Sequence, residues 1–329
     1  LVELLRTRAG QLPDNQAYLY LVDGEEEGAS VTFSELDQRA RSLAAWLQEE
    51  GFTGERALLL YPSGLDFIAA FFGCLYAGVV AVPVYPPRLN RPSPRIQAVV
   101  ADAQVAVALT TTKIYRGLAK RFDMMPELAA LRWLNSEEMR DDRSSQWQDA
   151  GIGSDDLAFL QYTSGSTGSP KGVMLSHGNL MHNLRVILHG FQMENESMGA
   201  FWLPSYHDMG LIGGILAPMY VKGSAVLMAP AAFLKRPVRC LEAISRYRTG
   251  ISGAPNFDYQ MCVEKISPEQ REGLDLSCWN IAFCGAEPIR LETLNSFAEM
   301  FAPQGFRRDS FYPCYGLAEG TLMVSGGKG

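Results

Sequence analysis

Residues 157–176 read LAFLQYTSGSTGSPKGVMLS and set two apolar segments around a loop of glycines and hydroxyl side chains. The segments 157–162 and 171–176 are short and apolar, so both are predicted to be strands. The loop holds these residues: Thr163, Ser164, Gly165, Ser166, Thr167, Gly168 and then Lys171. Amide and hydroxyl donors gathered at a strand end, without bulky Cβ atoms, suit a polyphosphate. The stretch therefore predicts an anion-binding loop in an α/β protein.

The same alternation of strands and helices extends along the chain in both directions. Helices are predicted from Ser34, with Asp37 in a capping box, to Gly51, from Ser63 to Gly78, over 177–191 and from Arg290. Strands are predicted over 56–61, 79–84, 105–110, 224–229, 280–285 and 309–316. Strands that alternate with helices indicate largely parallel sheets covered on both faces.

A chain of 329 residues suits two such units. The polar segment 137–156 is interpreted as the joint between them. The expected first α/β subdomain is therefore 1–150, and the expected second subdomain is 151–329, which carries the nucleotide and acyl site.

Composition excludes several classes of protein. The net charge of −7 and the lack of a basic run argue against nucleic-acid binding. The six cysteines have no C-x-x-C spacing and are expected to be free thiols, as in a cytoplasmic protein. The apolar run 67–85 is interrupted at Gly78, so it predicts a helix followed by a buried strand and no membrane span. The charged N-terminal segment does not read as a signal peptide.

The loop after Tyr162 differs from other glycine-rich motifs. It lacks the Ser or Thr after the lysine that a Walker A motif requires, and it is neither G-x-G-x-x-G nor the G-x-S-x-G of a nucleophile elbow. Its composition alone also fits an exposed surface loop.

Four motifs in order carry a family resemblance. The segment 163–172, TSGSTGSPKG, resembles the phosphate loop of the adenylate-forming superfamily, which includes acyl-CoA synthetases, luciferases and peptide-synthetase adenylation domains. LPSYHDMGLIGG (203–214), CGAEPI (284–289) and YGLAEGT (315–321) resemble its later motifs, and the similarity covers essentially the whole chain. It implies the large N-terminal domain of such an enzyme, with two sheet-and-helix subdomains in layers, a partial β-rich piece and no C-terminal lid domain.

The resemblance implies a role for each matching residue. Thr163 to Gly168 would hold the ATP phosphates, with Lys171 adding charge, and Thr163 and Glu319 would hold Mg²⁺. His207, beside Asp208, would bind the substrate carboxylate or the α-phosphate. The adenine site would comprise Gly285, Ala286, Glu287, Tyr315 and Gly316. The acyl pocket would comprise Met209, Gly210, Leu211 and Gly214. Ala318 departs from the family pattern, since many members have there a threonine that contacts the α-phosphate.

Among the branches of the superfamily, the chain looks most like the fatty acyl-AMP ligases. The resemblance implies ATP-dependent activation of a medium- or long-chain fatty acid as acyl-adenylate, with release of pyrophosphate. The acyl group would pass to the phosphopantetheine arm of an acyl carrier protein, in lipid, polyketide or lipopeptide biosynthesis. Coenzyme A as acceptor and a non-catalytic acyl-adenylate-binding module remain alternatives. Without the lid domain, the fragment is expected to be poorly active alone.

Overall fold

The computed structural model describes residues 1–87, 93–139, 141–163, 170–193 and 196–328. The chain divides into two compact units, each formed by two segments of chain. Unit 1 comprises Leu1–Asn15 and Thr32–Met181, and unit 2 comprises Gln16–Val31 and His182–Gly329. This division differs from the expected boundary at residue 150. The strands at 157–163 and 171–176, which lie after that point, pair with the first sheet, and an early hairpin joins the second sheet.

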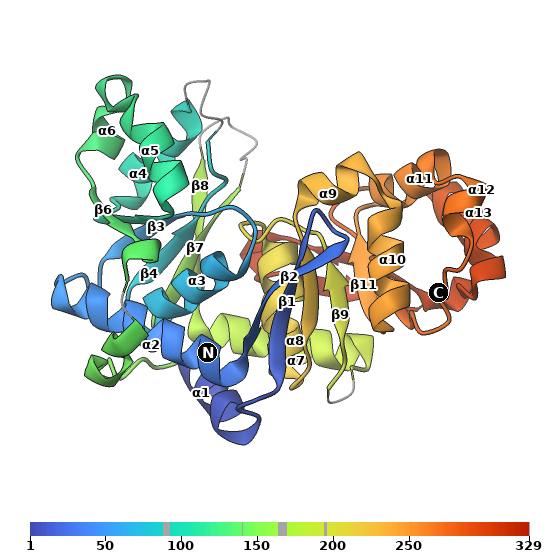
Figure 1. Cartoon of the computed structure of the whole chain (residues 1–329), viewed down its shortest axis with the longest axis horizontal. Helices are drawn as coiled ribbons and strands as arrows, with labels where there is room; N and C mark the ends of the chain where they lie inside the picture. Colours follow the sequence, from blue (N-terminus) through green and yellow to red (C-terminus); the bar gives the residue numbers. More distant parts are fainter. Residues whose placement is uncertain (88–92, 140, 164–169, 194–195, 329) are drawn as a thin grey trace. The chain divides into compact units, whose positions relative to one another are not determined.

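Unit 1 is built on a six-stranded sheet in the order β6-β5-β3-β4-β7-β8 (Figure 1). Its strands are β3 (Arg56–Leu60), β4 (Val80–Pro83), β5 (Val107–Thr110), β6 (Arg132–Asn135), β7 (Leu157–Thr163) and β8 (Lys171–Ser176). The pairs from β6 to β7 are parallel, and β8 pairs antiparallel with β7. The parallel sheet predicted from the sequence is confirmed, with an antiparallel strand at its edge.

Side-chain alternation along these strands fills both faces of the sheet. Leu58 and Leu60 of β3 belong to a core that includes Val99, Leu118 and Leu128 from the helices on one face. On the other face Phe159 of β7 makes an edge-to-face contact with Phe71, at a centroid distance of 5.7 Å. Successive strand residues point to opposite faces, so a run of apolar residues buries both.

The helices of unit 1 connect its strands. They are α1 (Val2–Gln11), α2 (Phe33–Glu49), α3 (Leu65–Ala77), α4 (Pro94–Ala103), α5 (Thr112–Ala119), α6 (Pro126–Ala129) and the 3₁₀ turns η1 (Phe122–Met124), η2 (Ser136–Glu138) and η3 (Asp141–Gln146). The apolar run 67–85 forms α3 and β4, as predicted, and Gly78 ends α3 in the left-handed conformation at φ +68°.

The N-terminus of α2 corrects one sequence prediction. The capping box is formed by Thr32 and Glu35, two residues before the expected pair. The carboxylate of Asp37 instead accepts hydrogen bonds from Arg41 and from the hydroxyl of Tyr76, both at 2.6 Å.

The segment 137–156 packs on unit 1, which corrects its interpretation as a joint. The Trp147 indole N–H donates to the Tyr76 carbonyl at 2.9 Å, and the Arg41 guanidinium lies 4.6 Å from the Trp147 ring centroid. The polar composition of this segment predicts a linker, but its single tryptophan, Trp147, anchors the segment to α2 and α3.

Unit 2 is built on an eight-stranded sheet in the order β14-β13-β12-β11-β9-β10-β1-β2. Its strands are β1 (Gln16–Val22), β2 (Glu26–Thr32), β9 (Gly199–Phe201), β10 (Ala225–Met228), β11 (Ile251–Ala254), β12 (Ile281–Cys284), β13 (Phe311–Gly316) and β14 (Met323–Gly326). The pairs β1–β10, β10–β9, β9–β11, β11–β12 and β12–β13 are parallel, and β14 is antiparallel to β13. The sequence reasoning missed β1, β2, β9, β11 and β14.

The helices of unit 2 bury aromatic side chains against both faces of this sheet. They are α7 (His177–Phe191), which begins in unit 1, the π-helix η4 (Met209–Leu216), α8 (Ala217–Tyr220), α9 (Pro230–Lys235), α10 (Val238–Tyr247), α11 (Asn256–Lys265), α12 (Pro268–Arg271), α13 (Leu291–Phe301), η5 (Ala302–Gln304), η6 (Arg308–Ser310) and η7 (Ala318–Gly320). Phe191 stacks on Phe283 at 5.8 Å between centroids, while Phe297 of α13 meets Tyr259 edge-on at 5.1 Å. Leu291, the first residue of α13, is 63% exposed, whereas Phe297 and Phe301 of the same helix are buried.

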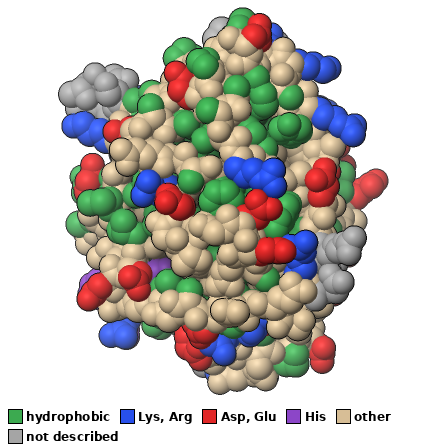
Figure 2. All heavy atoms as spheres, turned by 90° about the vertical axis from the view of Figure 1, so that its left-hand side faces the viewer, with side chains coloured by type: hydrophobic (Ala, Val, Ile, Leu, Met, Phe, Trp, Pro, Cys, Tyr) green, Lys and Arg blue, Asp and Glu red, His purple; other side chains and the backbone are tan. Residues whose placement is uncertain are grey.

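Acidic and basic side chains are intermixed over the face of the molecule in Figure 2. Within the described ranges, no helix has both the length and the apolar character needed to cross a bilayer. None of the six cysteines is bonded to another.

Close packing of α2 on α3 depends on Gly73. A Cβ at this position would lie 2.2 Å from Cδ2 and 2.7 Å from Cβ of Leu43. We expect Gly73→Ala to lower the free energy of unfolding by about 1–3 kcal/mol, because α3 must shift to accommodate the methyl group. The measurement is chemical denaturation of the purified protein.

Gly10 provides the matched control, since it lies in α1 and a Cβ there would meet nothing within 4 Å. Gly10→Ala should be neutral or stabilise by up to about 1 kcal/mol. Equal stabilities for the two variants would contradict the packing argument.

Candidate active site at a sheet edge

The carboxyl ends of the six parallel strands of unit 2, β1 and β9 to β13, lie at one edge of the sheet, and the connections that follow these strands begin there. β10 and β11 lie on opposite sides of β9, so the chain reverses its direction across the sheet at β9. Ligands of open α/β sheets bind outside the carboxyl ends of the strands at such a switch point. The predicted residues of unit 2 follow β9, β12 and β13, so they lie on connections at this edge.

His207 lies in the connection that follows β9. Its Nδ1 lies 2.6 Å from Oδ1 of Asp208, and the same carboxylate oxygen accepts the backbone N–H of Met209 at 2.7 Å. The hydrogen bond to Asp208 raises the pKa of His207, against the opposing effect of burial. About half of the His207 side chain is exposed, whereas that of Asp208 is 13% exposed. Asp208 therefore orients the ring, directs Nε2 away from itself and favours the imidazolium.

The loop after β12 holds the predicted adenine-binding residues Gly285, Ala286 and Glu287. A Cβ on Gly285 would lie 2.8 Å from the carbonyl oxygen of Cys314, so only glycine fits beside β13. Ala286 has φ +67°, a conformation that non-glycine residues rarely adopt and that is often found at functional sites. Glu287 accepts the backbone N–H of Phe257 at 2.6 Å, which ties this loop to the start of α11.

Tyr315 lies near the end of β13, and Glu319 lies in the turn between β13 and β14. Tyr315 is 60% exposed and Glu319 is also exposed. Gly316 is required for close approach, because a Cβ there would lie 1.9 Å from the carbonyl oxygen of Leu322. Thr321 closes the turn at φ +73° and ψ −58°, a strained γ-turn for a β-branched residue.

Asn183 of α7 holds this turn and was missed by sequence reasoning. Its side-chain amide donates to the carbonyls of Gly320 at 3.2 Å and Met323 at 2.9 Å, and its Oδ1 accepts the Met323 N–H at 3.0 Å. The only signal in the sequence was a polar residue inside an otherwise apolar helix.

The small residues of η4 pack against the chain itself. A Cβ on Gly210 would lie 2.1 Å from the Pro204 carbonyl oxygen, and one on Gly214 would lie 3.4 Å from Phe201. Met209, Gly210, Leu211 and Gly214 are all buried. Pro204 and Phe201 of β9 thus fill the space beside the two glycines. The acyl-pocket assignment of these four residues stays a prediction.

Asp258 is a second residue that the sequence reasoning missed. It lies on α11, immediately after β11, and is 2% exposed. Among the described residues, neither of its carboxylate oxygens has a hydrogen-bond partner. Burial, with a smaller contribution from Glu287, raises the pKa of Asp258 to about 8, so its carboxyl is mostly uncharged at neutral pH.

The first glycine motif belongs to unit 1. Thr163 ends β7 and pairs with Lys171 at the start of β8. Ser164, Gly165, Ser166, Thr167 and Gly168 lie outside the described residues. The strand is anchored just before the loop, because the Tyr162 hydroxyl donates to the Asp102 carboxylate at 2.5 Å and its ring lies on Gly172.

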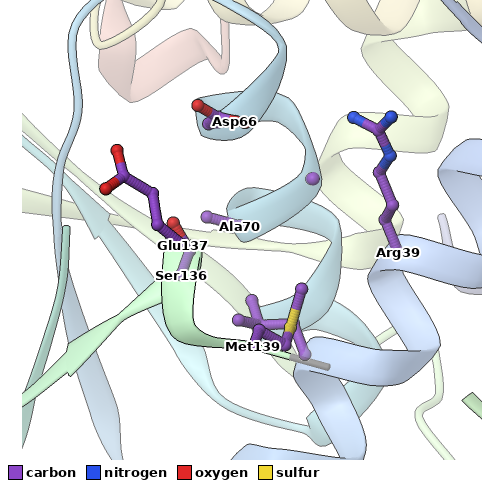
Figure 3. A pocket seen from close by; sticks show the side chains of 8 residues that line it. Arg39, Asp66, Ala70, Ser136, Glu137 and Met139 are labelled. Atoms are coloured by element: carbon purple, nitrogen blue, oxygen red, sulfur yellow. The ribbon is translucent and has the colours of Figure 1, made fainter. Parts of the chain in front are cut away.

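Unit 1 also has a hollow of about 130 Å³ (Figure 3). Arg39 from α2, Asp66 from α3, and Ser136 and Glu137 from η2 line it. None of the predicted site residues lines this hollow. The two carboxylates are exposed and therefore solvated, so the sheet edge of unit 2 is the stronger candidate.

An exposed carboxylate such as Glu319 and a hydroxyl such as Thr163 are oxygen ligands of the type that Mg²⁺ prefers. Over the described ranges, no three His, Cys, Asp or Glu side chains cluster to hold a metal by themselves. Each of these two groups by itself suits Mg²⁺, which keeps several waters and binds substrate phosphates as well.

The sequence pattern of the AMP-binding enzymes matches residues 5–328, so the chain belongs to this family. It is 47% identical over 329 residues to the medium-chain-fatty-acid (acyl-carrier-protein) ligase JamA of Moorena producens, covering 99% of this chain and 56% of that protein. It is 34% identical to the corresponding ligase TtuA of Teredinibacter turnerae, covering 96% and 55%.

A similar solved structure is a fatty acyl-adenylate ligase from L. pneumophila in complex with acyl adenylate and pyrophosphate. It has 45% sequence identity and a TM-score of 0.94, and covers 99% of this chain and 56% of that one. The chain thus spans about half the length of these relatives. The predicted family and fold class are confirmed.

The Asp208 contact predicts a shift in the titration of His207. Asp208→Asn removes the carboxylate that stabilises the imidazolium, so the pKa of His207 should fall toward the ordinary value of about 6.5. NMR titration of His207 measures this directly. An unchanged His207 pKa in this variant would contradict the assignment.

Asp258 predicts a dependence of stability on pH. Its pKa is raised in the folded state, so the folded protein retains a proton that the unfolded chain releases above about pH 4. Its contribution to stability therefore falls as pH rises from about 4 to about 8 and is constant above. Asp258→Asn should remove this slope.

The measurement is the difference in thermal midpoint between Asp258→Asn and the wild type at a series of pH values. The thermal midpoint of the variant should rise relative to that of the wild type from pH 5 to pH 8, and the difference should then stay constant. The other titratable groups near Asp258 are Glu287 and the high-pKa residues Tyr259, Cys240 and Cys262. A difference that does not vary with pH would show that Asp258 titrates normally.

Proposed function

We propose that this chain carries the adenylation site of a fatty acyl-AMP ligase. A carboxylate oxygen of a medium- or long-chain fatty acid attacks the α-phosphorus of ATP, and the bond from that phosphorus to the bridging oxygen of pyrophosphate breaks. The products are acyl-adenylate and pyrophosphate. The observation that carries the proposal is the location of His207, Gly285 and Tyr315 at one edge of a parallel sheet.

His207 and Asp208 handle the reacting anions in this proposal. The raised pKa of His207 favours an imidazolium, which donates a charge-assisted hydrogen bond to the substrate carboxylate or the α-phosphate. Holding the two reactants in line and compensating their charge are the main tasks in phosphoryl transfer.

The adenine ring is proposed to stack on the exposed ring of Tyr315, with Gly285 and Ala286 on its other side. The glycines beside the base allow close backbone approach. Glu287 is a less direct contact, since it already accepts a backbone N–H from α11.

The ATP phosphates are assigned to Thr163, Lys171 and the intervening loop of hydroxyl residues and glycines. Glu319 and Thr163 are the proposed Mg²⁺ ligands, and Mg²⁺, when bound, neutralises charge on the pyrophosphate. The β13–β14 turn and Asn183 position Glu319.

The proposed acceptor is the phosphopantetheine arm of an acyl carrier protein, in a cytoplasmic biosynthetic pathway for lipids, polyketides or lipopeptides. The names of the relatives JamA and TtuA support it, since both are called acyl-carrier-protein ligases. Coenzyme A is the second candidate, because a protein 37% identical to this chain is called a putative fatty-acid–CoA ligase. A C-terminal lid domain is the expected partner that completes the site.

ATP–pyrophosphate exchange dependent on dodecanoic acid tests the chemistry in the complete gene product. We expect His207→Ala to reduce exchange on the order of 10²-fold, because a donor to the developing charge is lost. Glu319→Gln should reduce exchange and raise the Mg²⁺ concentration needed for half-maximal rate.

Glu292→Gln, an exposed carboxylate on α13, is the matched control and should behave as wild type. Full exchange in Glu319→Gln would remove it from the metal site. Binding of acyl-adenylate without any exchange would instead indicate a non-catalytic module. Labelled dodecanoic acid offered with carrier protein or with coenzyme A then identifies the acceptor, and an acyl-CoA product would overturn the carrier-protein assignment.

A further inference from the structure

A small cavity in unit 2 lies beside β11 and the residue that follows β9, the strand at the switch point. Its volume is about 20 Å³, which is enough for one water-sized group. Trp202, directly after β9, and Ser252 to Ala254 of β11 form one part of its lining, and Asp258 and Tyr259 of α11 form another. His207 follows Trp202 by only five residues, so the cavity and the candidate carboxylate site share one connection.

Five aromatic side chains, held in place by packing, form part of the walls of the cavity. Trp202 stacks on Phe233, with 4.2 Å between ring centroids and 9° between ring planes. Tyr259 lies against Trp279 on another side. The space takes only one group of about the size of a methylene or a hydroxyl, and its apolar walls favour a methylene by about 0.8 kcal/mol.

The polar groups around the cavity are satisfied, with one exception. The Tyr259 hydroxyl donates to the Phe283 carbonyl at 2.8 Å, and the Ser252 hydroxyl donates to the Ala200 carbonyl at 2.7 Å. The Trp279 N–H donates to the Ile281 carbonyl at 2.8 Å. Asp258 is the exception, since within the described part of the chain both its carboxylate oxygens are buried and without a partner.

A buried carboxyl group without a partner is costly unless a ligand satisfies it. We propose that Asp258 is a specificity residue that selects fatty acids carrying a hydroxyl group on the acyl chain. The inference rests on the proposed function and deepens it. A protonated carboxyl both donates and accepts a hydrogen bond, and a hydroxyl complements both. An amine would instead leave an ion pair within aromatic walls, which is costly to desolvate.

The test compares dodecanoic acid with a set of its positional hydroxy isomers in ATP–pyrophosphate exchange by the complete gene product. We expect at least one isomer to exceed dodecanoic acid in kcat/KM. In Asp258→Leu that preference should fall by about tenfold or more, because an apolar pocket discriminates weakly between a chain with a hydroxyl and one without. Asp258→Asn keeps a donor and an acceptor and should retain most of the preference.

Circular dichroism establishes that each variant is folded, and Asp309→Asn, on an exposed carboxylate, is the matched control that keeps the wild-type ratio. If the wild type favours no hydroxy isomer, or if the preference survives in Asp258→Leu, the inference is wrong and Asp258 meets only a buried water. Absence of exchange with every fatty acid would instead overturn the proposed function. The two failures are therefore distinct.

Discussion

The parallel register of β9, β11, β12 and β13 is the constraint on which the candidate site depends. In a parallel sheet all carboxyl ends face the same edge, so connections far apart in the sequence meet there. Close approach between the strands requires small residues at particular points. A Cβ on Gly253 of β11, for example, would lie 2.3 Å from the carbonyl oxygen of Phe283 in β12 and 2.4 Å from its ring. The Phe283 ring that occupies this space also stacks on Phe191 of α7, which packs α7 on that face of the sheet.

Hydrogen bonds from side chains to the backbone then give each loop at this edge a single conformation. Asn183 bonds Gly320 and Met323, which follow Glu319 in the turn, and Glu287 bonds the first turn of α11. Asn256 likewise accepts the Arg290 N–H at 2.9 Å, so the connections after β11 and β12 are tied together. Backbone strain at Ala286 and Thr321 is tolerated because these contacts leave the loops few alternatives.

Buried polar groups in unit 2 differ in what they do. Tyr259, Ser252 and Trp279 satisfy backbone carbonyls and so stabilise the sheet without taking part in recognition. Asp258 lies among them with no such bond in the described structure, and its raised pKa reflects the cost of that environment. A carboxyl group that is costly to bury and bonds to no neighbour is a candidate for substrate recognition.

Long segments with strong periodicity were predictable, and short ones were not. The helix over 177–191 and the helix–strand break at Gly78 follow from apolar spacing and a left-handed glycine. β9 and β11 have three and four residues, too few for a period to be detected, and β1 pairs with β10, some 200 residues away. The predicted capping box lay two residues beyond the one at Thr32. Asp37, which was expected to cap the helix, instead accepts a hydrogen bond from Tyr76.

The sequence by itself determined the α/β class and the family, and it proposed His207, Tyr315 and Glu319 as candidate residues, because local propensity and short motifs encode them. Tertiary structure alone decided where the units divide, which loops share an edge and that Asp258 is buried without a partner. Strand order and burial arise from contacts between residues distant in the chain, and no local pattern of residues specifies them.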